Sequence, residues 1–547
     1  MFFPVPSFRT RLPHVSTSSM RRLVPFIALI SGFVVFGTAG RAGAATYHVE
    51  ADGSGDFPTI QAALAAAVGG DHIVLGDGTY AGAGNRDLNF LGKGVVLESA
   101  SADPNGCVID CEYLGRGVNF ITAETRQAQL LGVTITHGAG DGAGIYCYGS
   151  SPTIRDCILR ENGSNSLGAG IRCLSDAFPL MQDCLITENT SKSGGGIYLY
   201  GARAIVQGCE ISGNHATAVS GGGVWINLNS SLTLDHCTIT GNDAANSGGG
   251  VYLYFESTVA ISDCLIAGNS SALLGGGIFG FRVAPSITNT VITGNRCQSI
   301  DGGGVYLNQS APIFTGCTIG GNYAGGRAGG LALDSGSNAT VNRSIVWGDC
   351  AGDGSEVYLT DAGSQIHFDC SDVDPMTVTG PGSAFYGVNA FTADPQFCDA
   401  RPCTEAPTVL GDYRLDAASP CAPESAPAIC GLVGALDVGC GAAHAPGDET
   451  TIQAEIAAFP NPSDGAIEIR YAIPRAPGSE SGPLDLGIFD ATGRLIRAWV
   501  LAGGERVGSV AWDGRDRDGH LVPAGTYFCR VAGPNTDAAG RLIRLRR

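Results

Sequence analysis

Hydrophobic and polar positions recur along this chain about every 27 residues between Leu130 and Asp349. Each repeat opens with glycines, continues with an alternating apolar and aromatic run, and then has a cysteine followed five residues later by an asparagine. Two repeats read GGGIYLYGARAIVQGCEISGN (residues 194–214) and GGGVYLYFESTVAISDCLIAGN (residues 248–269). A fixed period built from short alternating runs, without a helical pattern, predicts an all-β solenoid of stacked coils.

The alternation within a repeat sorts its residues into an inner and an outer face. Ile197 and Leu199 share one face of a predicted strand, and the intervening tyrosines share the other. The cysteine and the isoleucine two residues after it also share the inner face. Stacked coils lie about 4.8 Å apart, so equivalent residues form ladders. The closing asparagine is expected to adopt turn backbone and to bond to the next coil. The cysteine position is occupied by Val133, Cys157, Cys184, Cys209, Cys237, Cys264, Thr290, Cys317 and Ser344, and the asparagine position by Asn162, Asn189, Asn214, Asn242, Asn269, Asn295 and Asn322.

The outer aromatic residues are the first candidate binding site. Seven coils at about 4.8 Å give a stripe roughly 29 Å long. Aromatic faces stack well on sugar rings and other flat apolar surfaces, so the stripe predicts binding of a polysaccharide or a cell-surface partner. The alternative is a self-stacking ladder that stabilises the sheet, or a stripe covered by loops. The candidate residues are Tyr146, Tyr198, Tyr200, Trp225, Tyr252, Tyr254, Phe279 and Tyr306.

A second, mixed column stands directly before the cysteines and is expected to face outward. It places Asp156 one coil from Asp183, and His236 one coil from Asp263. Neighbouring carboxylates can bind Ca²⁺ or divide acid and base roles, and an aspartate beside a histidine can orient a general base. These four residues are the candidate catalytic residues. The alternative is a solvated column of small polar side chains; apart from Ca²⁺, no metal or cofactor is predicted.

The GGGI and C-x-I-x-x-N elements resemble right-handed parallel β-helix proteins of the pectin-lyase-like fold, and are similar to repeats of polymorphic outer-membrane proteins. The resemblance covers roughly Tyr47 to Cys440. The opening VEADGSGDFPTIQAALAAA also resembles the start of pectin methylesterases. The later motifs of that family, and the ordered motifs of polygalacturonases, are absent from the sequence. A non-catalytic role is therefore favoured, with a polysaccharide lyase or glycoside hydrolase, or a structural adhesin or coat protein, as alternatives.

The N-terminal residues 1–45 have the pattern of an export signal. Arg21 and Arg22 precede an apolar stretch from Leu23 to Ala39, and small residues follow. Cleavage is predicted near Ala44 or Ala45, giving a secreted or outer-surface protein; a membrane anchor is the alternative. The formal net charge of −19 makes nucleic acid an unsuitable partner.

Residues 46–445 are predicted to form the β-helix. A short helix near Thr59 to Val68 would cover its first coil, and a strand follows at His72 to Leu75. The cysteine-rich residues 394–440 resemble the closing segment of bacterial β-helix proteins, which implies a disulfide-bonded cap on the last coil. Nineteen cysteines in an exported chain permit disulfides, and their connectivity is open.

Residues 446–455 are a predicted linker, and residues 456–547 a small β-sandwich with alternating strands and Asp-Gly-type turns. This part resembles the immunoglobulin-like module of flagellar hook-cap proteins and C-terminal sorting domains of type IX secretion. The resemblance implies contact with export machinery or surface attachment; a sandwich without a sorting role is the alternative. The residues that carry it are Trp512, Asp513, Gly514, Gly525 and Tyr527.

Overall fold

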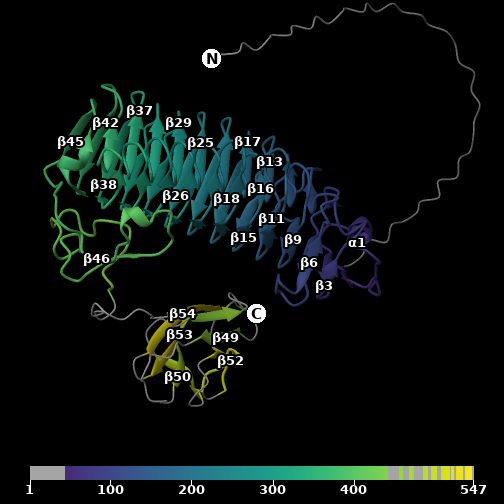
Figure 1. Ribbon diagram of the computed structural model, residues 1–547. Helices are drawn as coiled ribbons and strands as arrows, with labels where there is room; N and C mark the ends of the chain where they lie inside the picture. The colour runs from purple at the N-terminus through teal and green to yellow at the C-terminus, as the bar shows by residue number, and fades with distance from the viewer. Residues whose placement is uncertain are drawn as a thin grey trace, which may run out of the picture. The chain divides into compact units, whose positions relative to one another are not determined.

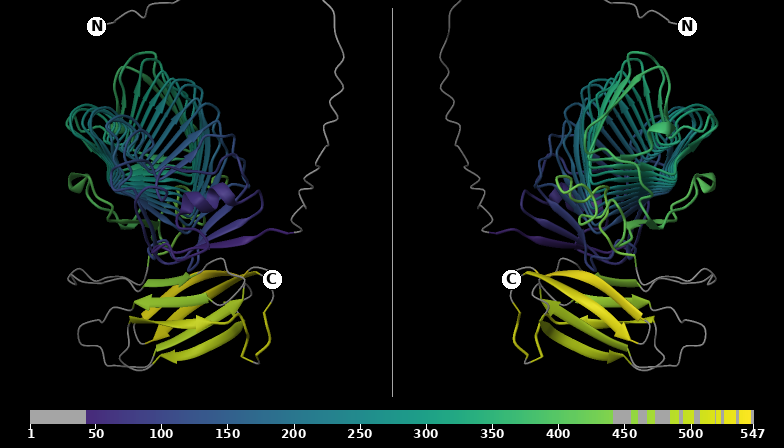
Figure 2. Two further views of the ribbon diagram at one scale, coloured as in Figure 1. Left: turned by 90° about the vertical axis from the view of Figure 1, so that its right-hand side faces the viewer. Right: turned by 90° about the vertical axis from the view of Figure 1, so that its left-hand side faces the viewer.

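The computed structural model describes residues 43–440 continuously, followed by residues 455–459, 467–472, 484–490, 494–501, 507–517, 519–522, 525–533 and 536–544. Nearly all of the predicted signal peptide and of the predicted linker lies outside these ranges. Within these ranges, residues 46–386 form a parallel β-solenoid whose coils stack along one axis (Figure 1). Figure 2 looks along that axis from each end. No helix in the described ranges is long and apolar enough to cross a membrane.

Four parallel sheets run along the solenoid. Sheet 1 has 14 strands, from β1 (Thr46–Val49) to β45 (Ser383–Tyr386). Sheets 2 and 3 have 12 strands each, from β3 (Gly78–Tyr80) to β43 (Asp372–Val373) and from β4 (Leu88–Asn89) to β44 (Val378–Thr379). Sheet 4 has seven two-residue strands, from β16 (Thr190–Ser191) to β40 (Cys350–Ala351).

One coil contributes a strand to each sheet in turn. The coil that starts at Gly194 contains β17 (Ile197–Tyr200) in sheet 3, β18 (Arg203–Gln207) in sheet 1, β19 (Glu210–Ser212) in sheet 2 and β20 (His215–Ala216) in sheet 4. Each strand pairs in register with its equivalent one coil on, as Ile197 does with Val224. The repeat pattern predicted β17 and β19; it did not separate β18 and β20 from the segments between them.

The cysteine column lies inside, as predicted, and it also forms hydrogen bonds between coils. The backbone N–H of Cys184 donates to Sγ of Cys209 at 3.4 Å. Where the column changes residue type the same bond persists: Cys264 N–H donates to Thr290 Oγ1, and Cys317 N–H to Ser344 Oγ. Threonine and serine accept the same bond as cysteine, which explains why they can replace it at this position.

The asparagines form a fully buried ladder. Nδ2 of Asn242 donates to Oδ1 of Asn269 at 2.9 Å and to the carbonyl oxygen of Ile211 at 2.8 Å. Its own Oδ1 accepts from the backbone N–H and Nδ2 of Asn214. The predicted bond to the next coil is confirmed. The left-handed conformation at this turn falls on the residue before the asparagine, such as Gly241 at φ +62°.

The glycine triplets pass too close to neighbouring backbone to carry side chains. A Cβ on Gly222 would lie 2.5 Å from the carbonyl oxygen of Asp243 and 2.6 Å from that of Gly249. On Gly221, at φ +69°, it would meet the Cβ of Trp225 at 2.7 Å. The triplet thus lets the loop lie against the asparagine ladder on one side and the aromatic column on the other.

The asparagine ladder ends on a carboxyl group. Asp349 Oδ1 accepts from the backbone N–H and Nδ2 of Asn322 at 2.7 and 2.8 Å, while its buried Oδ2 has no partner in the described chain. Burial, and then the nearby Glu356 carboxylate, raise the pKa of Asp349 well above its usual value. The folded state therefore holds the proton more tightly than the unfolded state.

Replacing Asp349 by asparagine is expected to stabilise the fold increasingly as pH rises. A raised folded-state pKa contributes stability that is complete below the unfolded pKa and is lost as pH rises through the folded pKa. The loss is about 1.4 kcal/mol for each pH unit that separates the two pKa values. Asparagine does not titrate, and its Nδ2 would donate to the Ile319 carbonyl, as Asn322 does to that of Ile292. Urea unfolding of both proteins at pH 4 and pH 8 measures how the difference between their free energies of unfolding changes with pH. An equal difference at both pH values would contradict this assignment.

One end and one flank of the solenoid are covered by other segments. At the N-terminal end, α1 (Ile60–Ala66) buries Ile60, Ala63 and Leu64 against the first coils, with Thr59 Oγ1 accepting from the backbone N–H of Ala62. This helix lies within the range that the sequence predicts, Thr59 to Val68. At the other end, residues 394–440, called the strap below, extend beyond the last coil and fold back over the outer flank of sheet 2.

The strap is attached by disulfides and by backbone bonds. Two disulfides, Cys350–Cys403 and Cys370–Cys430, join it to the coils, and Cys398–Cys440 closes it on itself. Thr408 N–H donates to the carbonyl of Gly294, and Gly434 N–H to that of Arg343. The strap carries the short antiparallel pair β46 (Phe397–Asp399) and β47 (Asp412–Leu415). It therefore covers several coils of the flank, more than the cap on the last coil that the sequence predicted.

The C-terminal strands form two antiparallel sheets. One contains β48 (Glu455–Phe459), β49 (Ile467–Ala472) and β52 (Val507–Trp512); the other contains β51 (Leu495–Leu501), β50 (Leu484–Asp490), β53 (Gly525–Gly533) and β54 (Thr536–Arg544). Trp512 and Tyr527 are buried, with ring centroids 5.3 Å apart, and Trp512 Nε1 donates to the Arg515 carbonyl. Two residues of the predicted motif thus form part of a core.

Candidate functional site

Five of the eight predicted aromatic residues form one continuous stack on the outer face of sheet 3: Tyr198, Trp225, Tyr252, Phe279 and Tyr306. Ring centroids lie 4.3 Å apart for Tyr198 and Trp225, 4.7 Å for Tyr252 and Phe279, and 5.6 Å for Phe279 and Tyr306. Their planes are within a few degrees of parallel. The faces of each ring therefore pack against the neighbouring rings. Tyr198 and Trp225 are accordingly only 4% and 9% exposed.

The N-terminal end of the stack continues into cationic side chains. The Arg116 guanidinium lies 4.4 Å from the centroid of Tyr146, and that of Arg172 lies 5.4 Å from the centroid of Tyr198. Asp141 pairs with Arg172. In these cation–π contacts, the ring faces pack against side chains of the protein itself and are less available to a ligand. The stack has the geometry of a self-stacking ladder that stabilises the sheet.

A second row of aromatic residues lies two positions further along the same strands, and only this row has solvent-exposed ring surface. Tyr148 and Tyr200 are 48% and 42% exposed, and Tyr254 is half-buried against Phe281. The row is interrupted, because Leu174 and Asn227 occupy the equivalent positions in the coils next to Tyr200. A ligand would meet separate tyrosines here, without a continuous stripe.

The four candidate catalytic residues occupy a left-handed corner between sheets 1 and 2. Asp156, Asp183, His236 and Asp263 have φ of 53°, 51°, 51° and 52°. Glycine, asparagine and aspartate tolerate this conformation best, so the backbone accounts for much of the column's composition. All four side chains point outward, as predicted.

The first pair at this corner, Asp156 and Asp183, has a cation beside it. Arg155 Nε lies 3.2 Å from Oδ2 of Asp156. Burial raises the pKa of Asp156, while Arg155 opposes the shift and Asp183 adds to it; burial also raises the pKa of Asp183. The guanidinium of Arg155 therefore already balances part of the negative charge of this pair.

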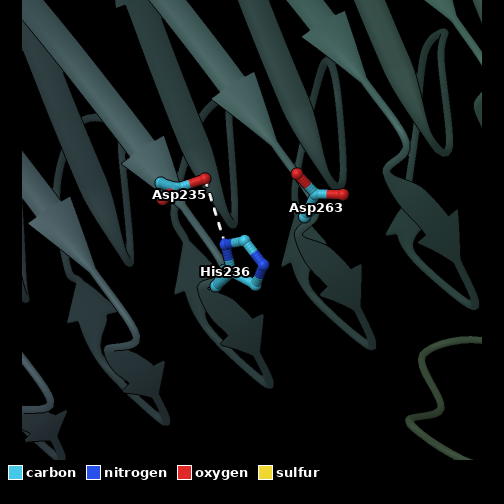
Figure 3. A group of neighbouring side chains, drawn as sticks. All are labelled: Asp235, His236 and Asp263. Carbon is cyan, nitrogen blue, oxygen red and sulfur yellow. Dashed lines mark ion pairs between the residues drawn. The ribbon is translucent and has the colours of Figure 1, made fainter. Parts of the chain in front are cut away.

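The second pair belongs to a cluster of three, shown in Figure 3. His236 Nδ1 lies 3.1 Å from Oδ1 of Asp235, and Asp263 enters from the next coil. One donor atom from each side chain lies within 4.8 Å of the other two. The hydrogen bond from Ser262, and the contact with His236, hold the pKa of Asp235 below its usual value. Asp235, which directly precedes the His236 corner, was not among the predicted residues.

This cluster borders a groove between the flank of sheet 2 and the strap. The groove has a volume of about 470 Å³, and most of its wall is apolar. His236, Asp263 and Asn289 line it from three successive coils, and Asp412, Tyr413 and Arg414 line it from the strap. Leu265, Val291, Val409 and Leu436 supply the apolar wall.

Strap residues bring hydrogen-bonding groups to the groove. Arg414 forms a bidentate pair with Asp412, with Nε lying 2.9 Å from Oδ1. Tyr413 is buried at the wall, with its hydroxyl beside that of Thr293, which also lines the groove. The combination of apolar surface and a few convergent polar groups is typical of a small-ligand site.

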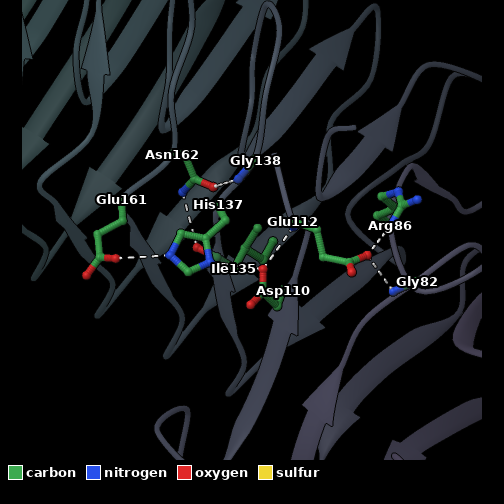
Figure 4. Close-up of polar contacts among 9 residues, drawn as sticks. All are labelled: Gly82, Arg86, Asp110, Glu112, Ile135, His137, Gly138, Glu161 and Asn162. Atoms are coloured by element: carbon green, nitrogen blue, oxygen red, sulfur yellow. Dashed lines mark hydrogen bonds and ion pairs between the residues drawn. The ribbon is translucent and has the colours of Figure 1, made fainter. Parts of the chain in front are cut away.

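A second histidine cluster, near the N-terminal end, was not predicted. His137 contacts Asp110 through Nδ1 at 3.0 Å and Glu161 through Nε2 at 3.2 Å, so both ring nitrogens are occupied (Figure 4). Beside it, Arg86 pairs with Glu112. These contacts join successive coils and leave no imidazole atom for a ligand.

Comparison with known proteins supports the solenoid assignment. The model of the family described as "Right handed beta helix region" matches residues 68–205 and 170–373, which together span more than half of the chain. The chain belongs to the right-handed β-helix family. No curated protein matches this β-helix protein.

Two solved structures are similar to this β-helix protein. Pectate lyase Pel9A is 15% identical, with a TM-score of 0.37 over 74% of this chain and 98% of that one. Dimeric latent PorU from Porphyromonas gingivalis is 24% identical, with a TM-score of 0.15 over 17% of this chain. The alignment spans only 9% of the PorU chain. Neither similarity bears on activity, so the site must be judged by its own residues.

Proposed function

We propose that this β-helix protein is exported and binds a carbohydrate in the groove between sheet 2 and the strap, without cleaving it. The observation that carries the proposal is the composition of that groove. Leu265 and Val291 offer a surface for the apolar faces of sugar rings, and Asn289 and the Asp412–Arg414 pair offer hydrogen bonds to hydroxyl groups. The groove volume falls in the range of small-ligand sites.

The rigidity of the groove supports binding. Two disulfides attach the strap, and the opposite wall consists of strands in register, so little conformational entropy is lost when a ligand binds. The stacked rings of Tyr198 to Tyr306 present little face to solvent, which makes the groove the better site. The separate exposed tyrosines Tyr148 and Tyr200 are the second candidate surface.

The proposal includes export and attachment. The pattern of residues 1–45 supports secretion. The two antiparallel sheets with Trp512 and Tyr527 in their core support an immunoglobulin-like module after the solenoid. Its role in this proposal is contact with export machinery or the cell surface. The net charge of −19 argues against nucleic acid as the ligand.

Replacing Arg414 by glutamine is expected to weaken retention on a polysaccharide panel about tenfold or more, because loss of a charged hydrogen-bond donor costs about 1.5–3 kcal/mol. Arg401→Gln is the matched control. Arg401 pairs with Asp399 on the same strap with the same two-residue spacing, and it does not line the groove. Retention is measured by affinity electrophoresis of the full chain.

Three outcomes would overturn the proposal. Equal retention of the Arg414 and Arg401 variants would exclude the groove. Loss of retention on replacing Tyr148 and Tyr200 by alanine, with Arg414→Gln unaffected, would move the site to the outer tyrosines. New reducing or unsaturated ends in the incubated polysaccharide would show a hydrolase or a lyase.

A further inference from the structure

We propose that Asp235, His236 and Asp263 form a binding site for a divalent transition-metal cation such as Zn²⁺ at the edge of the groove. Two carboxylates and one imidazole meet there from two successive coils, with donor atoms within 4.8 Å of one another (Figure 3). The small rotations that exposed side chains allow bring such donors onto one ion. The site is independent of whether the groove binds carbohydrate.

The three ligands are held by their surroundings before any ion binds. His236 and Asp263 occupy equivalent left-handed corners in adjacent coils, whose spacing the sheets fix. Ser262 Oγ donates to Oδ1 of Asp235 at 2.8 Å, and Asn289 Nδ2 donates to Oδ1 of Asp263 at 3.2 Å. One oxygen of each carboxylate is thus oriented by a hydrogen bond, and the other remains for the metal. Contacts of this type orient ligands in metalloproteins.

Charge at the cluster also favours a cation. Neither Asp235 nor Asp263 pairs with a lysine or arginine within the part of the chain that the structure describes; the one ion pair there is between Asp235 and His236. The equivalent corner at Asp156 differs, because Arg155 stands beside it. The charge of the two carboxylates matches that of a divalent ion.

The groove supplies an independent sign that a ligand is accommodated here. His236 and Asp263 line the same 470 Å³ volume as the strap residues Tyr413 and Arg414. A cation held by three side chains keeps coordination positions open, and here these face the groove.

The imidazole decides the class of ion. Carboxylates alone suit Ca²⁺ and Mg²⁺, whereas a histidine ligand favours Zn²⁺ and related ions. Nε2 of His236 makes no hydrogen bond within the described residues, in contrast to His137, whose two nitrogens are both occupied. The structure therefore points to Zn²⁺ in preference to the Ca²⁺ that the sequence suggested for this column.

Isothermal titration of the full chain with ZnCl₂ tests the site. One Zn²⁺ is expected per chain, bound more tightly than Ca²⁺, and His236→Asn and Asp263→Asn are each expected to weaken binding about tenfold or more. Asparagine is tolerated at this corner, since Asn289 occupies it one coil further on. Asp183→Asn changes an equivalent corner carboxylate without a histidine nearby, and should leave Zn²⁺ affinity unchanged.

Unchanged Zn²⁺ affinity in His236→Asn would overturn the site, as would tighter binding of Ca²⁺ than of Zn²⁺, or the absence of Zn²⁺ binding to the unsubstituted chain. Thermal unfolding gives a second readout. Zn²⁺ should raise the Tm of the unsubstituted and Asp183→Asn proteins, and should raise that of His236→Asn far less. Because no carbohydrate is present, a failure here leaves the groove proposal standing, and the reverse also holds.

Discussion

Replacing Asn242 by alanine is expected to lower the free energy of unfolding by about 4 kcal/mol or more. Its side chain takes part in four buried hydrogen bonds, two donated to Ile211 and Asn269 and two accepted from Asn214. Alanine removes all four and leaves their partners buried. A buried donor or acceptor without a partner costs about 1–3 kcal/mol, so the loss exceeds that of a typical surface change.

Equilibrium urea unfolding followed by circular dichroism measures this loss. Asn338→Ala is the control, because Asn338 is an exposed asparagine at the start of β38 (Asn338–Asn342), outside the ladder. Its effect should stay within about 0.5 kcal/mol. Similar unfolding midpoints for the two variants would show that the ladder contributes little to the stability of the solenoid.

Replacing Gly222 by alanine is expected to destabilise the solenoid by about 3 kcal/mol or more, with sheet 3 displaced locally. The added Cβ would lie within 2.7 Å of three backbone atoms, from Asp243 and Gly249. These atoms belong to coils fixed by their own hydrogen bonds, so they cannot move apart without breaking the stack.

Gly201→Ala separates this steric cost from the cost of left-handed backbone. Gly201 has φ of +55°, and a Cβ there would meet no atom within 4 Å. Its substitution should cost about 1–2 kcal/mol. Thermal and urea unfolding of the two variants under the same conditions give the comparison. Equal losses would mean that backbone conformation, and not packing, makes glycine necessary in the triplet.

Much of the solenoid follows from residues close together in sequence. The repeat pattern predicts that Ile197 and Leu199 point inward, that the cysteines are buried and that Asn242 bonds to the next coil. What the period did not reveal was the role of each position. The residue with left-handed backbone is the one before the asparagine. The cysteines fill the interior and also accept hydrogen bonds from the neighbouring coil. A one-dimensional pattern marks a special position without saying which backbone angle or bond makes it special.

The candidate site was predictable only in part. The pairing of His236 with Asp263 followed from the coil spacing, because equivalent residues in adjacent coils must lie side by side. Asp235 was not predicted. It ends a strand directly before the left-handed corner at His236, and the alternation of inner and outer residues along a strand does not apply at such a corner. The aromatic residues were correctly placed in one column, but whether their faces are free depends on ring angles and on the glycine loop beside them.

The sequence by itself determined a stack of parallel coils with an apolar interior, because the hydrophobic period is local and every coil repeats it. Only the tertiary structure decided where a ligand can be held. Arg414 and Tyr413 face the flank near His236 because the disulfides Cys350–Cys403 and Cys370–Cys430 turn the strap back across the coils. Such contacts join segments far apart in the chain, and no period relates them. The groove and the metal site at its edge therefore depend on how the chain folds back on itself.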